Sequence, residues 1–144
     1  MKLAIAFVLG MVAMVCIQGK TADWLVLPFF AFHLDRGIYC NDKAAGLGWE
    51  RSHSESNRSQ ITVFRNSNCE WSAVGVKCGL PLQVGDVRLG GCAGGVTGYG
   101  APVMPAGGFV ATYERKTWGV NVIMVPPFGD SSPGVIWLQA KVPW

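Results

Sequence analysis

The sequence predicts an all-β fold: an eight-stranded antiparallel transmembrane β-barrel that follows a cleaved signal peptide. Three features predict it: an alternating C-terminal strand, a set of strand-length segments separated by turns, and an apolar leader. Alternation of period two is typical of a strand with two different faces. The apolar face of the C-terminal strand ends on an aromatic residue, which is typical of the lipid-facing side of a membrane barrel. That face carries Ile136, Leu138, Ala140, Val142 and Trp144, and the other carries Trp137, Gln139, Lys141 and Pro143.

The N-terminal residues 1–22 have the order of a secretory signal peptide. Lys2 precedes an apolar run from Leu3 to Val15, and small residues follow, with cleavage expected after Gly19 or Ala22. A membrane anchor helix is the alternative, but spanning a bilayer takes about 20 apolar residues and Lys20 ends the run. We therefore expect residues 23–144 to form the barrel. The expected location is the outer membrane of a Gram-negative bacterium, reached through the periplasm.

Turn-rich sequences divide the remainder into eight strand-like segments. Each has roughly the length, about 9–11 residues, that a tilted strand needs to cross a bilayer. No apolar segment beyond residue 22 is long enough for a membrane-spanning helix, so a membrane location requires a closed barrel. A secreted soluble β-sandwich is the alternative, because alternation does not distinguish lipid from a second packed sheet. The segments are 24–35, 45–53, 59–67, 71–80, 86–97, 104–113, 117–125 and 135–144.

The parity of the residues assigns faces to the later segments. In the seventh, Trp118, Val120, Val122 and Met124 are expected outward, with Gly119 and Asn121 inward. In the fourth, we expect Gly75, Lys77 and Gly79 to point inward. The apolar residues between and beside them are expected outward: Val74, Val76, Cys78 and Leu80. In the fifth, Cys92 is expected inward. Cys78 and Cys92 then lie on opposite faces, so we expect no disulfide between them.

The first segment is apolar on both faces over the stretch from Trp24 to Phe32. A strand that is apolar on both sides is buried on both sides, so part of the lumen is expected to be apolar. An eight-stranded barrel has room for packed side chains or for one slim ligand, such as an acyl chain. Packing by large side chains is the alternative.

Topology gathers polar residues at one rim. With both termini in the periplasm, the first and third segments run outward and end near His33 and at Asn66–Ser67. Cys40 and Cys69 fall in loops on the same rim, so a disulfide between them is the pairing we expect, and an oxidising compartment permits it. His53 falls at the opposite end, where we expect a solvated side chain.

The composition excludes several classes of function. A formal charge of +3 without a basic stripe argues against nucleic acid. No Cys or His residues have metal-ligand spacing, so no metal is expected. We expect no other cofactor either. We expect a monomer whose partners are membrane lipids.

The rim and strand motifs resemble the lipid A palmitoyltransferase of Gram-negative outer membranes. That family is an eight-stranded barrel that moves a palmitoyl chain from a phospholipid onto lipid A. Short motifs across most of the chain carry the resemblance, including a proline five residues before the rim histidine. They are residues 25–33, 63–67, 89–98, 101–105 and 125–127.

The resemblance implies a catalytic site of His33, Asn66 and Ser67, in which Asn66 replaces the aspartate of the family. It also implies lateral openings for lipid where prolines interrupt strand pairing, since proline has no N–H for the ladder. Gly75 is the nearest match to the inward glycine that sets acyl length in the family. Two alternatives remain open: a catalytically inactive lipid-binding or structural barrel, and a lipid A deacylase. The prolines are Pro28, Pro102, Pro105 and Pro126.

Overall fold

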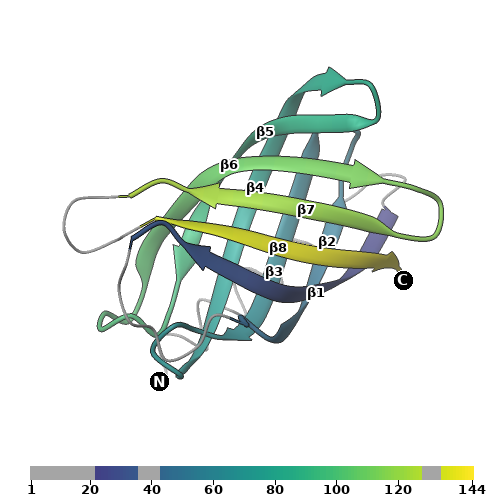
Figure 1. Cartoon of the computed structure of the whole chain (residues 1–144). Coiled ribbons are helices and arrows are strands. Elements are labelled where there is room, and N and C mark those ends of the chain that lie inside the picture. Colours follow the sequence, from purple (N-terminus) through teal and green to yellow (C-terminus); the bar gives the residue numbers. More distant parts are fainter. Residues whose placement is uncertain (1–21, 36–42, 128–133) are drawn as a thin grey trace.

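The protein is a closed barrel of eight antiparallel strands in chain order, with β8 paired back to β1 (Figure 1). This computed structural model describes residues 22–35, 43–127 and 134–144. It confirms the predicted all-β barrel and excludes the two-sheet sandwich. The predicted signal peptide lies outside the described residues, apart from Ala22. The strands are β1 (Ala22–His33), β2 (Gly46–Ser52), β3 (Asn57–Arg65), β4 (Trp71–Val84), β5 (Val87–Val96), β6 (Met104–Glu114), β7 (Gly119–Val125) and β8 (Val135–Pro143).

The alternation predicted for β7 and β8 is confirmed. In β7, Asn121 and Ile123 are buried in the lumen, while Val122 and Met124 are exposed outside. In β8 the lumen side carries Trp137, Gln139 and Lys141, all buried, and Trp144 after the strand is 84% exposed. Within the three described ranges, no helix is long and apolar enough to cross a membrane.

A β-bulge explains why β1 is apolar on both faces. The register with β8 shifts between Pro28 and Phe30, which inserts one extra residue into β1. Trp24 and Val26 face the lumen before the bulge, and Ala31 faces it afterwards, so the inward parity changes within the strand. Even-numbered residues of β1 face the lumen before the bulge and odd-numbered residues face it afterwards, so both sets need to be apolar.

The face assignment for β4 is wrong: its alternation has the opposite phase. Val74, Val76, Cys78 and Leu80 are buried in the lumen, whereas Lys77 is exposed outside. The sequence pattern was inverted because the lumen wall here is apolar and the outer wall carries glycines and a lysine. Gly75, between two lumen-facing valines, is consequently on the outward phase.

Cys78 and Cys92 form a disulfide, contrary to the sequence-based expectation. The two residues are direct cross-strand partners, their Cα atoms are 4.0 Å apart, and both side chains face the lumen. The incorrect phase of β4 caused the error, because Cys92 was placed inward correctly. Cys69 is also disulfide-bonded. Its predicted partner, Cys40, lies outside the described residues.

Glycines in β5 allow an unusually close approach to β4. A Cβ atom at Gly94 would lie 1.9 Å from the carbonyl oxygen of Gly75, and one at Gly90 would lie 1.8 Å from that of Gly79. No side chain fits at these distances, so only glycine permits this curvature of the wall. The glycine-rich sequence of β5 thus has a geometric cause.

The outer wall is mainly apolar. Large side chains are exposed on the outer face of every strand except β5, a distribution that is rare on soluble proteins. Three tryptophans, Trp71, Trp118 and Trp144, lie at or next to strand ends. The exposed set is Leu27, Phe29, Phe32, Leu34, Leu47, Val63, Trp71, Leu82, Val84, Phe109, Trp118, Val122, Met124, Val142 and Trp144.

Candidate functional site

A cavity of about 440 Å³ occupies one end of the barrel. This end, where β1 and β3 finish, is opposite to the end that holds Ala22 and Trp144. The cavity walls are mostly apolar, while its mouth is polar. The walls include Ala31, Phe64, Val74, Val96, Met104 and Trp137, and the mouth includes His33, Arg65, Asn66, Ser67, Asn68 and Tyr99.

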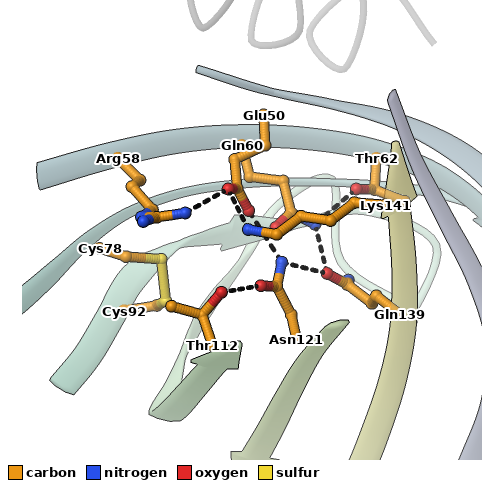
Figure 2. The surroundings of a disulfide bond; sticks show 10 residues. All are labelled: Glu50, Arg58, Gln60, Thr62, Cys78, Cys92, Thr112, Asn121, Gln139 and Lys141. Carbon is orange, nitrogen blue, oxygen red and sulfur yellow. Dashed lines mark hydrogen bonds and ion pairs between the residues drawn. A yellow bond between two sulfur atoms is a disulfide. The ribbon is translucent and has the colours of Figure 1, made fainter. Parts of the chain in front are cut away.

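Packed aromatic rings form the floor of the cavity. Beyond them, toward the other end of the barrel, the lumen is polar. The ring centroids of Phe64 and Trp137 are 4.8 Å apart, with tilted planes. Toward the other end, Gln60 donates to Gln139, and Asn121 donates to both Gln139 and Glu50 (Figure 2). The apolar cavity is therefore confined to one end of the lumen.

Four charged side chains close the polar end. Lys141 Nζ lies 2.6 Å from a carboxylate oxygen of Glu50 and 2.6 Å from one of Glu114. Arg58 pairs with the same two carboxylates. Two cations and two anions balance, so this charged cluster (Glu50, Arg58, Glu114 and Lys141) carries no net charge. Cys78 of the disulfide is the cross-strand partner of Arg58 from this cluster, and Figure 2 shows the two side by side.

His33, Asn66 and Ser67, the three predicted catalytic residues, line this one cavity at its mouth. His33 is the last residue of β1, and the other two directly follow β3. The structure thus brings together the residues that topology predicted to meet, and their catalytic role stays a prediction. His53 lies at the opposite end, where its Nε2 is 2.9 Å from the hydroxyl oxygen of Ser59.

Asn66 is fully hydrogen-bonded as a structural residue. Its Oδ1 accepts bonds from the backbone N–H groups of Asn68 and Glu70, both at 2.9 Å. Its Nδ2 donates to the hydroxyl of Ser72 and to the carbonyl of Gly98. The side chain is 1% exposed. An amide suits this position because one side faces donors and the other faces a carbonyl, so Asn66 holds the turn and the neighbouring loop together.

Replacement of Asn66 by aspartate is expected to destabilise the barrel rather than create a better catalyst. The new carboxylate oxygen would face the Gly98 carbonyl without a hydrogen to donate, leaving a buried acceptor unsatisfied at a cost of about 1–3 kcal/mol. Urea titration of the folded protein in detergent would measure this, with Asn68→Asp, an exposed neighbour, as the control. An N66D protein as stable as N68D would contradict the structural role.

Tyr99 is a mouth residue that the sequence reasoning missed. Burial raises the pKa of its phenol, while the nearby side chain of Ser67 opposes the rise. Gly98 and Gly100 on either side have φ of +85° and +82°, a conformation that favours glycine. The Gly98-Tyr99-Gly100 sequence could have predicted this role, because two glycines around one aromatic residue are typical of a tight loop that exposes the aromatic side chain.

The barrel wall has two lapses in strand pairing, both beside the cavity. The β1–β2 ladder stops at Val26 and Gly48, so Leu27–His33 pair with β8 alone. The β6–β7 ladder starts at Phe109 and Met124, so Met104–Gly108 pair with β5 alone. These stretches contribute His33, Met104 and other residues to the cavity lining.

The four predicted gate prolines differ in position. Pro28 is buried in β1 at the bulge, next to the first lapse, and Pro126 directly follows β7 at the second. Pro105 lies in β6 and lines the cavity. Pro102 is exposed in the preceding loop and does not line it. Gly75, predicted to contact the acyl chain, does not line it either, because it faces outward.

No protein-family model matches the chain, and no curated protein matches its sequence. Among residues 22–35, 43–127 and 134–144, no group of three or more His, Cys, Asp or Glu side chains could hold a metal ion. The fold and site define a class by geometry alone: a β-barrel with an apolar exterior and an apolar cavity that has a polar mouth.

Proposed function

We propose that this protein is an outer-membrane acyltransferase of the lipid A palmitoyltransferase type, which moves an acyl chain from a phospholipid to lipid A. The observation that carries the proposal is the apolar cavity with His33 and Ser67 at its mouth. An apolar cavity that opens onto a few polar groups suits a long chain whose reactive ester stays at the polar end.

The exterior of the barrel supports the membrane location. The outward side chains of Phe29, Val63 and Phe109 are each more than two-fifths exposed and would face hydrocarbon. Outside the two lapses, closure of the sheet satisfies the backbone hydrogen bonds between neighbouring strands, as a lipid environment requires. The predicted leader and the disulfide fit export to an oxidising compartment.

The two lapses in strand pairing support lateral entry of lipid. A chain that enters through the mouth would have to leave the membrane first, whereas an opening in the wall lets it slide in from the bilayer. The lapses at β1–β2 and β6–β7 lie at the level of the cavity and on different sides of it. One could admit the donor and the other the acceptor.

The polar mouth supplies groups for acyl transfer. In the proposed reaction, His33 takes the proton of the acceptor hydroxyl as its oxygen attacks the ester carbonyl of the donor. The hydroxyls of Ser67 and Tyr99 can donate to the carbonyl oxygen as negative charge develops on it. The ester C–O bond of the donor then breaks, and the leaving lysophospholipid takes the proton from His33.

Expression in a Gram-negative bacterium that lacks such an enzyme tests the proposal. Mass spectra of extracted lipid A should show a new species heavier by one acyl chain. Cells carrying the empty vector provide the baseline. Unchanged lipid A in cells that fold the barrel would contradict acyl transfer, and a loss of acyl mass would indicate a deacylase instead.

A non-catalytic lipid-binding barrel is the second candidate, and the bonding of Asn66 favours it. Because all four hydrogen-bonding positions of this amide are used within the protein, it is not available to orient the imidazole of His33. This candidate predicts that lipid co-purifies with the barrel while lipid A stays unchanged.

A further inference from the structure

A polar row crosses the outer wall at the end of the barrel remote from the cavity. The strand register places Asp23 of β1 beside Arg51, Arg51 beside Ser59, and Ser59 beside Lys77 of β4. The next outward-facing row toward the cavity end is Leu25, Trp49, Ile61 and Gly75. On β1, β2 and β3 the polar row therefore lies at the boundary of the apolar exterior, whereas β4 continues past Lys77 to the exposed side chains of Leu82 and Val84.

Arg51 is held and neutralised within this row. Its guanidinium makes two hydrogen bonds to the Asp23 carboxylate, at 2.7 and 2.9 Å. It also lies over the ring of Trp49, with 4.7 Å between the guanidinium carbon and the ring centroid. Asp23 and Arg51 together therefore contribute no net charge to the row.

Lys77 gives the row its net positive charge. The side chain is exposed, and the part of the chain that the structure describes holds no ion pair to it. Ser59, its cross-strand neighbour, is half-buried and lies within hydrogen-bonding distance of His53, 2.9 Å between Oγ and Nε2. An ammonium and a hydroxyl thus lie side by side at the edge of an apolar wall.

We propose that Lys77 and Ser59 bind the phosphate headgroup of an anionic phospholipid. A lysine ammonium and a hydroxyl are donors for phosphate oxygens, and a basic side chain beside a membrane surface attracts anionic lipid. The lipid chains would lie against the apolar wall that begins at Ile61. A net charge of +1 selects an anionic headgroup over a zwitterionic one. The inference rests on the membrane location in the proposed function but not on acyl transfer, because the row is remote from the cavity.

Native mass spectrometry of the mature protein in detergent micelles tests this site. We expect dioleoylphosphatidylglycerol to bind more tightly than dioleoylphosphatidylcholine. Lys77→Gln should weaken phosphatidylglycerol binding about fivefold, whereas Lys77→Arg should retain it. Lys116→Gln, which removes an exposed lysine from the β6–β7 turn, is the matched control and should bind as the wild type does.

Three outcomes would overturn the site: equal binding of the two lipids, K77Q binding equal to that of K116Q, or complete displacement of the lipid by an equal concentration of inorganic phosphate. The last result would identify a free-anion site. Failure here leaves the lipid A mass spectra unaffected, so it is distinguishable from failure of the acyltransferase proposal.

Discussion

Replacement of Lys141 by methionine is expected to lower the free energy of unfolding by about 3–5 kcal/mol, the cost of removing one partner from a buried ion pair. Lys141 is completely buried, and its Nζ lies between carboxylate oxygens of Glu50 and Glu114. Without it, the single positive charge of Arg58 faces two carboxylates. Methionine fills a similar volume, so the lost stability can be attributed to the missing charge rather than to a change in packing.

Urea-induced unfolding in detergent micelles would measure the effect, with Lys116→Met as the control because Lys116 is exposed in a turn. The double variant Lys141→Met, Glu50→Gln should recover part of the loss. It leaves Glu114 with Arg58, which bonds both oxygens of that carboxylate. A K141M protein as stable as K116M would show that the charged cluster does not stabilise the barrel.

The parts of the fold that the sequence predicted well are those whose two faces differ sharply in chemistry. Trp137, Gln139 and Lys141 of β8 face a partly polar lumen, while Leu138, Ala140 and Val142 face outward. In such a strand, the sequence indicates both the period of the alternation and which face lies inside the barrel. The same holds for β7, where Asn121 marks the inside.

The phase of β4 could not be read in this way. Alternation reports a period of two but not which face is inside, and here Val74 and Val76 face an apolar cavity while Lys77 faces outward. A rule that places apolar residues toward lipid then gives the inverted answer. The Cys78–Cys92 disulfide was missed for the same reason.

The site was predictable in its residues but not in its bonding. In an antiparallel barrel alternate strands end on the same rim, which is why His33 and Ser67 could be placed together. The partners of Asn66 include Gly98, a residue 32 positions later in the chain, whose proximity depends on the β4–β5 register. Such long-range contacts leave no local pattern, so the structural role of Asn66 became visible only in three dimensions.

Replacement of His33 by alanine is expected to reduce acyl transfer at least about 100-fold, since a positioned general base contributes roughly 10²–10⁴ in rate. His33 places an imidazole at the cavity mouth, and histidine is the side chain that most often transfers protons as a general base. Ser67→Ala and Tyr99→Phe remove hydrogen-bond donors only, so each should leave more activity than His33→Ala does.

The measurement is the ratio of acylated to unmodified lipid A, normalised to the amount of folded barrel. Glu70→Ala is the control, because Glu70 is an exposed residue of the same rim whose side chain does not line the cavity. If H33A retained the acylation of E70A, the proton would have to be taken by another group and the assignment of His33 would be wrong. If only H33A lost activity while its unfolding midpoint in urea stayed that of the wild type, the loss would be chemical, because the fold would be intact.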